Sequence, residues 1–322
     1  MKKTISLLLV LVMLALTLTA CGGKESDTVR LGGMTGPTSI GMAQLLENNE
    51  NGDTLNRYDF TLATAGDEIK TKLIQGELDI AAVPANLASA LYNATGGKIK
   101  ILAINTLGVV SILEKGDSIQ SIKDLAGKTV YAPSTAQGAI PELVFRYLLS
   151  QNGVEGVTLE FIDATQLAPK LGQEAGAVVL SPQPNASAIL TNVAGAREAL
   201  NLNDEWKKLE NGAEYITGVV VARTAFIEEN PEAVENFLKE YAVSVAYVST
   251  ANAKDVASLV TEHKILAVSE TIVEKAIPAC NIKYIGGEEM KTAMRGFIDL
   301  VFDGNPKAFG GKKPDDGFYY IK

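Results

Sequence analysis

Histidine and cysteine are nearly absent from the 322-residue chain, which has one histidine, His263, and two cysteines, Cys21 and Cys280. A single histidine excludes a histidine-rich zinc site and leaves no plausible Ser-His-Asp triad. His263 stands between Glu262 and Lys264 in a helical pattern, where we expect it to be solvated. Cys280 lies in an apolar neighbourhood and is expected to be a buried packing residue. We therefore predict no catalytic residue, no metal site and no cofactor.

Positive charge is also scarce, since 29 Lys and Arg face 38 Asp and Glu, which gives a formal net charge of −9. An acidic surface disfavours nucleic acid and anionic lipid, because both are bound through clusters of Lys and Arg. Long apolar runs are missing after the first twenty residues. The longest later runs, such as 177–180 and 219–221, are typical of buried strands.

The N-terminus is the exception, because Lys2 and Lys3 precede an apolar run from Ile5 to Thr19. A basic start, an apolar stretch and small residues before a cleavage point indicate a secretory signal peptide over residues 1–20. The run of about 15 residues is shorter than the ~20 that span a bilayer. A plain signal peptide or a membrane helix with an incidental cysteine is the alternative.

The cysteine that follows this segment makes it similar to the lipobox of bacterial lipoproteins. That resemblance implies cleavage before Cys21 and a lipid on its sulfur, followed by a short polar tether over residues 21–27. Loss of Lys2 and Lys3 lowers the net charge from −9 to −11. Lipidation of Cys21 leaves Cys280 without a partner, so no intrachain disulfide is expected.

Strand and helix patterns alternate along most of the chain, which predicts an α/β fold with parallel sheets. The first series has strands at 28–31, 60–63, 79–83 and 99–105 and helices at 39–48, 67–75 and 87–94. The second has strands at 109–114, 129–132, 158–162 and 177–180 and helices at 121–125, 138–150 and 185–193. A strand at 215–222 is followed by a mainly helical part, with helices at 231–249, 253–262, 269–276 and 288–303.

Two stretches suit crossings between separate lobes, because each ends an apolar run with hydroxyl or small residues beside a glycine. They are 105–108 and 216–218. We therefore predict one lobe from residues 28–106 plus 217–322 and a second from residues 107–216.

Five stretches resemble the solute-binding lipoproteins of ABC importers, in the branch of the nitrate, sulfonate, taurine and thiamine-precursor binding proteins. They are GPTSIGM (36–42), IQGELDIA (74–81), SIKDLAGKTV (121–130), SPQPNAS (181–187) and YITGVVVAR (215–223). The resemblance covers essentially the whole mature chain. It implies a two-lobed type II periplasmic-binding-protein fold with two hinge crossings and a helical C-terminal part.

Ligands of open α/β sheets bind at the carboxyl ends of the strands, opposite helix N-termini, which places the candidate site in four loops and two crossings. The candidate ligand-binding residues are Met34, Thr35, Thr38 and Ser39 after the first strand, Pro84 and Asn86, Ser134, Thr135 and Gln137, Gln183, and Asn105, Thr106 and Thr217 at the crossings. For each loop, helix capping or turn formation is the alternative role. Tyr92, Tyr131 and Tyr215 are expected either to stack on a planar ligand or to pack in the core.

The four loops contain hydroxyl, amide and backbone donors but no Arg or Lys, which a clamp for a fully charged anion usually includes. Helix N-termini are the alternative source of anion binding. We therefore expect a small polar solute that is neutral or weakly anionic.

The predicted function is an extracytoplasmic, lipid-anchored, monomeric protein that delivers this solute to the transmembrane subunits of an ABC permease. One alternative is a surface sensor coupled to a receptor. Another is an enzyme on the same scaffold, such as the fungal pyrimidine synthases, which use histidine and pyridoxal phosphate. His263 lies outside all four loops, and the pairs at 228–229 and 315–316 are adjacent carboxylates typical of solvated charge, so the enzyme is not favoured.

Overall fold

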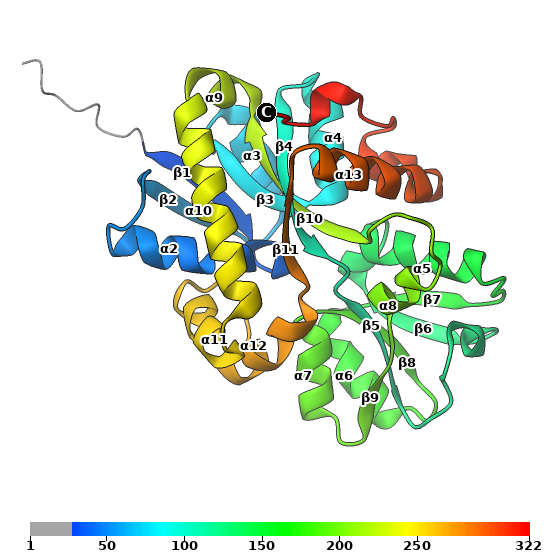
Figure 1. Cartoon of the computed structure of the whole chain (residues 1–322). Coiled ribbons are helices and arrows are strands. Elements are labelled where there is room, and N and C mark those ends of the chain that lie inside the picture. The colour runs from blue at the N-terminus through cyan, green and yellow to red at the C-terminus, as the bar shows by residue number, and fades with distance from the viewer. Residues whose placement is uncertain (1–27) are drawn as a thin grey trace, which may run out of the picture.

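The computed structural model describes residues 28–322, so the predicted signal peptide (1–20), the tether (21–27) and Cys21 lie outside the described residues. Within that range, no helix combines the length and apolar character that a membrane crossing requires. The described chain forms two sheets, each flanked by helices, and is therefore a mixed α/β structure as predicted (Figure 1).

The first sheet has six strands in the order β11-β4-β10-β3-β1-β2. Its strands are β1 (Val29–Met34), β2 (Tyr58–Ala63), β3 (Ile80–Pro84), β4 (Ile99–Leu107), β10 (Ile216–Arg223) and β11 (Ile282–Gly286). β1 pairs in parallel with β2 and β3, while β10 runs antiparallel between β3 and β4. β3 and β10 are almost completely buried, because helices cover both faces of the sheet.

Helices from both ends of the chain cover this sheet. They are the 3-10 helix η1 (Pro37–Met42), α2 (Ala43–Glu50), α3 (Gly66–Gln75), α4 (Ala85–Thr95), α9 (Thr224–Glu229), α10 (Pro231–Thr250), α11 (Ala253–Glu262), α12 (Glu270–Ala276) and α13 (Gly287–Val301). Residues of α2, α10 and α11 share one apolar cluster, and residues of α3 and α4 belong to another. In Figure 1, α10 crosses the near side of the sheet and α13 lies above the second lobe.

The second sheet has five strands in the order β7-β6-β8-β5-β9. Its strands are β5 (Val110–Lys115), β6 (Thr129–Pro133), β7 (Thr158–Ile162), β8 (Val178–Pro182) and β9 (Ala196–Asn201), and its helices are α5 (Ile140–Gln151), α6 (Ala164–Gln173), α7 (Asn185–Asn192) and α8 (Leu202–Lys207). β6 runs parallel to β7 and β8, and β5 is antiparallel to β8 and β9. Each sheet thus has an antiparallel strand, β10 or β5, between parallel ones, and the first sheet has a second antiparallel strand, β11, at its edge.

The chain passes from the first sheet to the second between Leu107 and Val110 and returns between Asn201 and Ile216. The predicted lobe boundaries, 106/107 and 216/217, lie at the last residue of β4 and the first residue of β10, and the division into lobes at these positions stays a prediction. Aromatic side chains fill the junction beside them: the ring of Trp206 on α8 lies 5.8 Å from those of Tyr215 and of Phe297 on α13. An apolar core therefore continues from one lobe into the other through the hinge.

The C-terminal part is mainly helical, as predicted, but it also contains a strand that the sequence did not reveal, because Ile282–Gly286 forms edge strand β11 beside β4. One expectation about this part is wrong. His263 is not solvated: its side chain is only 7% exposed and lies 3.8 Å from Glu47 and 3.6 Å from Glu50. Packing of α11 against α2 covers the imidazole, which the local charge pattern did not reveal.

Candidate functional site

The carboxyl ends of the parallel strands β1, β2 and β3 lie on the same side of the first sheet, which we call its carboxyl-end edge. Register places Met34 opposite Ala63 on β2, and antiparallel β10 places Gly218 opposite both Pro84 and Thr106. The predicted loop residues of this lobe, which begin at Met34, Pro84, Asn105 and Thr217, therefore share this edge.

The second sheet has a matching edge. Register places Pro133 opposite Ile162 and Val110 opposite Pro182. Ser134, Thr135 and Gln137 follow β6, and Gln183 follows β8, so all four lie at the edge that the first crossing joins to the other lobe.

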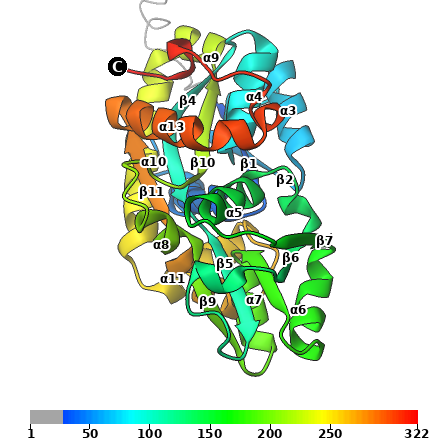
Figure 2. The same ribbon diagram turned by 90° about the vertical axis from the view of Figure 1, so that its right-hand side faces the viewer.

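The loop of Gly138 also touches the first lobe directly, because the Nδ2 of Asn305 donates to the Gly138 carbonyl oxygen at 3.2 Å. The loop after β6 therefore contacts the segment that follows α13, and α5, which this loop leads into, lies between the two sheets in Figure 2.

Thr38 is held at the first edge by its neighbours. Asn105 donates its Nδ2 proton to the Thr38 carbonyl oxygen at 2.8 Å, and Thr106 donates its hydroxyl to Asn105 Oδ1 at 2.9 Å. Gly218 makes this packing possible, since a Cβ there would lie 2.5 Å from Thr38 Cγ2 and 2.6 Å from Asn105 Oδ1. Thr38 is 7% exposed, and its own hydroxyl neither bonds to a described residue nor is sealed from solvent.

Gln183 at the second edge is likewise buried and has one polar group that makes no hydrogen bond to a described residue. It is 6% exposed, and its Oε1 accepts hydrogen bonds from the Ser187 hydroxyl at 2.8 Å and the Ser187 amide at 3.3 Å. Its Nε2 makes no hydrogen bond within residues 28–322 and is not among the enclosed polar atoms. Each lobe therefore presents one well-anchored side chain with a single unused polar group.

Several other candidates support this edge from inside. Ser39, Asn105 and Thr106 are buried, and the hydroxyl of Ser39 donates to the Met34 carbonyl oxygen at 2.7 Å. The Thr217 hydroxyl is enclosed without a hydrogen-bond partner. In this conformation these four residues lie behind the candidate site, with their polar groups turned into the protein.

The remaining candidates are accessible. Ser134, Thr135 and Gln137 are exposed, and Met34, Thr35, Pro84 and Asn86 are partly exposed. They stay predicted contacts.

The three tyrosines pack in the core. Tyr92 donates its hydroxyl to Asp315 and packs on Phe318 with ring centroids 5.1 Å apart. Tyr131 donates to Glu174 at 2.9 Å, and Tyr215 is completely buried among aromatic rings. Of the two roles that the sequence left open for them, packing is the one that these contacts fit.

Charge is distributed unequally over the helix N-termini at the two edges. In the second lobe Glu142 accepts a hydrogen bond from the Gly138 amide at 2.6 Å, and Asp163 caps α6 by accepting one from the Thr165 amide at 2.9 Å. In the first lobe α4 has no side-chain cap and no acidic residue in its first turn. The first turn of α3 in the same lobe has two acidic residues, whereas that of α7 in the second lobe has none. Free amide donors are therefore available at α4, while carboxylates lie at the N-termini of α3, α5 and α6.

The sequence reasoning missed Glu142 and Asn305. A capping carboxylate shortly after a helix start is a signal that was available for Glu142. No local pattern marks Asn305, because its partner Gly138 is 167 positions away.

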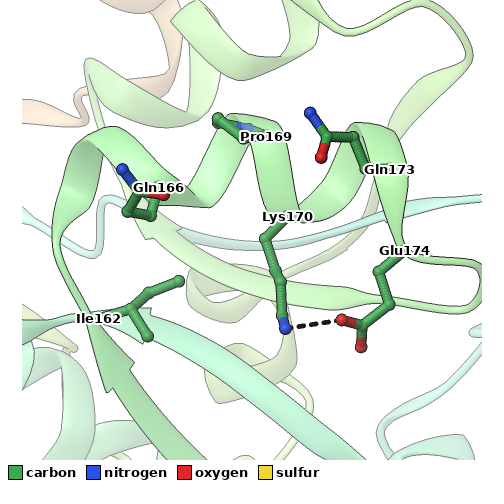
Figure 3. A pocket seen from close by; sticks show the side chains of 6 residues that line it. All are labelled: Ile162, Gln166, Pro169, Lys170, Gln173 and Glu174. Atoms are coloured by element: carbon green, nitrogen blue, oxygen red, sulfur yellow. Dashed lines mark ion pairs between the residues drawn. The ribbon is translucent and has the colours of Figure 1, made fainter.

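A separate hollow of about 550 Å³ lies beside α6 on the second lobe (Figure 3). It is lined by Ile162, Gln166, Pro169, Lys170, Gln173 and Glu174. The Lys170 ammonium forms an ion pair with Glu174 at 2.6 Å and lies 4.2 Å from the centre of the Tyr131 ring. Its hydrogen bonds to Glu174 and Tyr131 raise the pKa of Lys170. Ile162 is the last residue of β7, so only one end of the hollow reaches the strand edge.

Residues 28–322 contain no group of three or more His, Cys, Asp or Glu side chains arranged to hold a metal ion. Cys280 is buried, as predicted, and burial raises the pKa of its thiol to about 12.

The two lobes, their strand orders and the double crossing define the type II periplasmic-binding-protein fold. Solved structures show the same fold. An ABC transporter protein from Parabacteroides distasonis is 24% identical with a TM-score of 0.76, over 92% of this chain and 99% of that one. The periplasmic aliphatic sulphonate binding protein SsuA from Escherichia coli is 15% identical with a TM-score of 0.71, over 91% and 92%. The periplasmic nitrate-binding protein NrtA from Synechocystis is 15% identical with a TM-score of 0.57, over 83% and 75%.

A family model described as NMT1/THI5 like matches residues 71–255, which is more than half of the sequence. The chain belongs to the NMT1/THI5-like family. No curated protein sequence matches it.

Proposed function

We propose that this protein is the extracytoplasmic solute-binding component of an ABC importer, which captures a small polar solute between its lobes and delivers it to a membrane permease. The matching environments of Thr38 and Gln183 carry the proposal. Each is more than nine-tenths buried, belongs to a different lobe and has one unused polar group at the strand edge. Family membership and the fold shared with sulfonate- and nitrate-binding proteins support it.

The solute in this proposal is neutral or weakly anionic. The carboxylates of Glu142 and Asp163 occupy helix N-termini of the second lobe, where they oppose a fully charged oxyanion. The uncapped N-terminus of α4 offers amide donors to a carbonyl or weakly acidic group instead. The contacts proposed around Thr38 and Gln183 are the exposed and partly exposed candidates, with Ser39, Asn105, Thr106 and Thr217 behind them.

Ligand-dependent melting of protein purified without refolding tests this proposal, together with native mass spectrometry for retained solute. Thr38→Val removes the hydroxyl with little change of shape, and Gln183→Leu removes the amide. Each loses one hydrogen bond to the solute worth about 0.5–1.5 kcal/mol, so each should weaken binding about two- to twelvefold. Gln183→Leu also loses the two bonds from Ser187, and its unliganded melting temperature is measured alongside.

Thr158→Val is the matched control, because Thr158 is exposed at the opposite end of edge strand β7. A folded protein that shows no retained solute and no melting shift with any polar solute would contradict the function. Equal weakening by Thr158→Val would contradict the assigned contacts.

We also propose that lipid on Cys21 anchors the mature protein to the cell membrane, facing outward. Cys21→Ser should release it into the soluble extracytoplasmic fraction, while Cys280→Ser should leave it with the membrane. Fractionation and the mass of the mature N-terminus measure this. Unchanged membrane association of the Cys21→Ser protein would overturn the anchor.

A further inference from the structure

A second cavity, of about 420 Å³, lies between the lobes where α8 approaches β11. Its wall includes Leu107 at the first crossing, Asn203 and Lys207 on α8, and Ile282 and Lys283 on β11. In Figure 2, α8 and β11 lie toward the left and β6 and β7, which lead into the predicted solute loops, toward the right. This cavity is therefore distinct from the proposed solute site, and its volume falls within the range of small-molecule sites.

The floor of the cavity is aliphatic. Leu107, Ile277 and Ile282 each line it and are buried, with 8–9% exposure. Two polar groups in the wall are already used within the protein: Asn281 Nδ2 donates to the Gly108 carbonyl oxygen, and the Ser249 hydroxyl donates to the Ile282 carbonyl oxygen at 3.0 Å. Neither is free for a ligand.

The ammonium groups of Lys207 and Lys283 are the charged groups of this wall, and none of its lining residues is a carboxylate. The nearest ion-pair partner of Lys207 is Asp204, at 3.9 Å with both side chains mostly exposed. Lys283 takes part in none of the ion pairs found within residues 28–322. One cation without an ion pair in the described range, and a second with only a long and exposed ion pair, above an aliphatic floor favour an anion with an apolar body.

We propose that this cavity binds a small organic carboxylate, with its carboxylate between Lys207 and Lys283 and its apolar body on Leu107, Ile277 and Ile282.

Such a ligand would bridge the lobes. Leu107 donates its amide proton to the Asn281 carbonyl oxygen at 3.1 Å, so the start of β11 is fixed to the first crossing. Lys283 is on β11 of the first lobe and moves with that lobe, whereas Lys207 is on α8 of the second lobe. A change of lobe angle alters the space between the two lysines, and a bound carboxylate therefore favours some angles over others.

By linkage, the carboxylate and the transported solute then change each other's affinity by the same factor. This coupling rests on the proposed function, but binding at the cavity does not.

Isothermal titration of the purified mature protein with benzoate tests the site, with benzamide as the uncharged isostere. We expect one benzoate per protein. Each ion pair at a partly exposed site contributes about 0.3–1 kcal/mol, so Lys207→Gln and Lys283→Gln should each weaken benzoate binding about two- to fivefold. Benzamide should bind correspondingly more weakly, and added salt should weaken benzoate alone.

Lys208→Gln is the matched control, because Lys208 is the next residue on α8, pairs with Glu205 at 2.5 Å and does not line the cavity. No benzoate binding at millimolar concentration, or equal loss with Lys208→Gln, would overturn the proposal. Loss of benzoate binding in the Thr38→Val protein would also overturn it, since benzoate would then occupy the interlobe site. A normal solute response with no benzoate response rejects this cavity alone, whereas the reverse result rejects the proposed function alone.

Discussion

Asp79 shows how one residue of a family-specific stretch serves the fold and not the ligand. It belongs to the IQGELDIA segment, yet its carboxylate is 3% exposed and the residue precedes β3, at the opposite end of that strand from the proposed site. It accepts hydrogen bonds from the Arg30 amide at 3.0 Å, from Arg30 Nε at 2.8 Å and from an Arg223 NH2 group at 2.6 Å. The side chain therefore ties β1 and β10 to the start of β3.

Removal of this charge should destabilise the protein. Asp79→Asn leaves two arginines facing a neutral amide. Breaking a buried pair costs about 3–5 kcal/mol, and the partial exposure of Arg30 reduces that to about 2–3 kcal/mol. Urea unfolding measures the change, with exposed Asp59→Asn as a control expected within about 0.5 kcal/mol. A loss no larger than that of the control would refute the structural role.

The same pair predicts a pH dependence. Burial by itself would raise the pKa of Asp79, but hydrogen bonds from Arg30 and Arg223 outweigh burial and lower it. A carboxyl whose folded pKa lies below its unfolded value, about 3.9, stabilises the protein above that value. That contribution is lost as pH falls through the folded pKa. The stability gap between wild type and Asp79→Asn should therefore be constant at pH 6–8 and shrink below about pH 4. A gap that stays constant down to pH 3 would contradict this assignment.

Among the elements, β10 is central because it is the return strand between β3 and β4 and carries Gly218 at the site edge. The absence of a side chain at this position lets Thr38 and Asn105 pack against the strand. The sequence predicted a crossing at 216–218 partly because of this glycine. It did not show that Thr38 and Asn105, which are 67 positions apart in the sequence, pack together against it.

Gly218→Ala should therefore disturb both stability and binding. The added methyl group would lie 2.5 Å from Thr38 Cγ2, and overpacking of this kind costs about 1–3 kcal/mol. Displacement of Thr38 should also weaken solute binding in the melting assay. Gly172→Ala is the control, since its Cβ would meet only Val193 at 3.7 Å and alanine favours a helix interior. Equal stability of the two variants would contradict the close contact.

Elements with long, regular apolar patterns were predicted within a few residues, such as β3, β4, β10, α3 and α10. Those missed were α6, α8, α9, β9 and β11. β11 has five residues, lies at a sheet edge and alternates weakly, so its pattern does not stand out between helices. α6 contains Pro169, and α8 has six residues, which leaves little periodicity to detect. Short elements of this kind are stabilised by the neighbours they pack on.

At the scale of the whole molecule, two hydrogen bonds join the lobes away from the crossings. Asn305 Nδ2 donates to the Gly138 carbonyl oxygen at 3.2 Å, and Lys275 Nζ donates to the Thr191 hydroxyl at 3.2 Å. Asn305 follows α13, and Lys275 belongs to α12, so the two bonds come from different C-terminal elements. Both favour the arrangement in which the lobes are in contact.

Asn305→Ala should weaken solute binding without unfolding the protein. The loss of about 0.5–1 kcal/mol from the lobe-contacting state lowers its population and raises the apparent Kd about two- to fivefold. Melting of the unliganded protein should change little, since Asn305 Nδ2 has no bonding partner within its own lobe. Lys275→Met removes the more exposed bond and should have a smaller effect. Solute affinity unchanged in both variants would show that these bonds do not bias closure.

The sequence by itself determined the α/β class and the scarcity of histidine and cysteine, and it predicted the crossings and the strand ends proposed to carry the site. These follow from local apolar periodicity, from turn residues and from composition, all of which a short window of sequence records. Tertiary structure decided which candidates face the junction. Ser39, Asn105 and Thr106 form the same kind of polar pattern as Thr38, yet packing buries their groups in internal hydrogen bonds. It also decided the burial of His263, the carboxylates at the second lobe's helix starts, and the lysines that meet behind the hinge. These depend on contacts between distant segments, which no local pattern encodes.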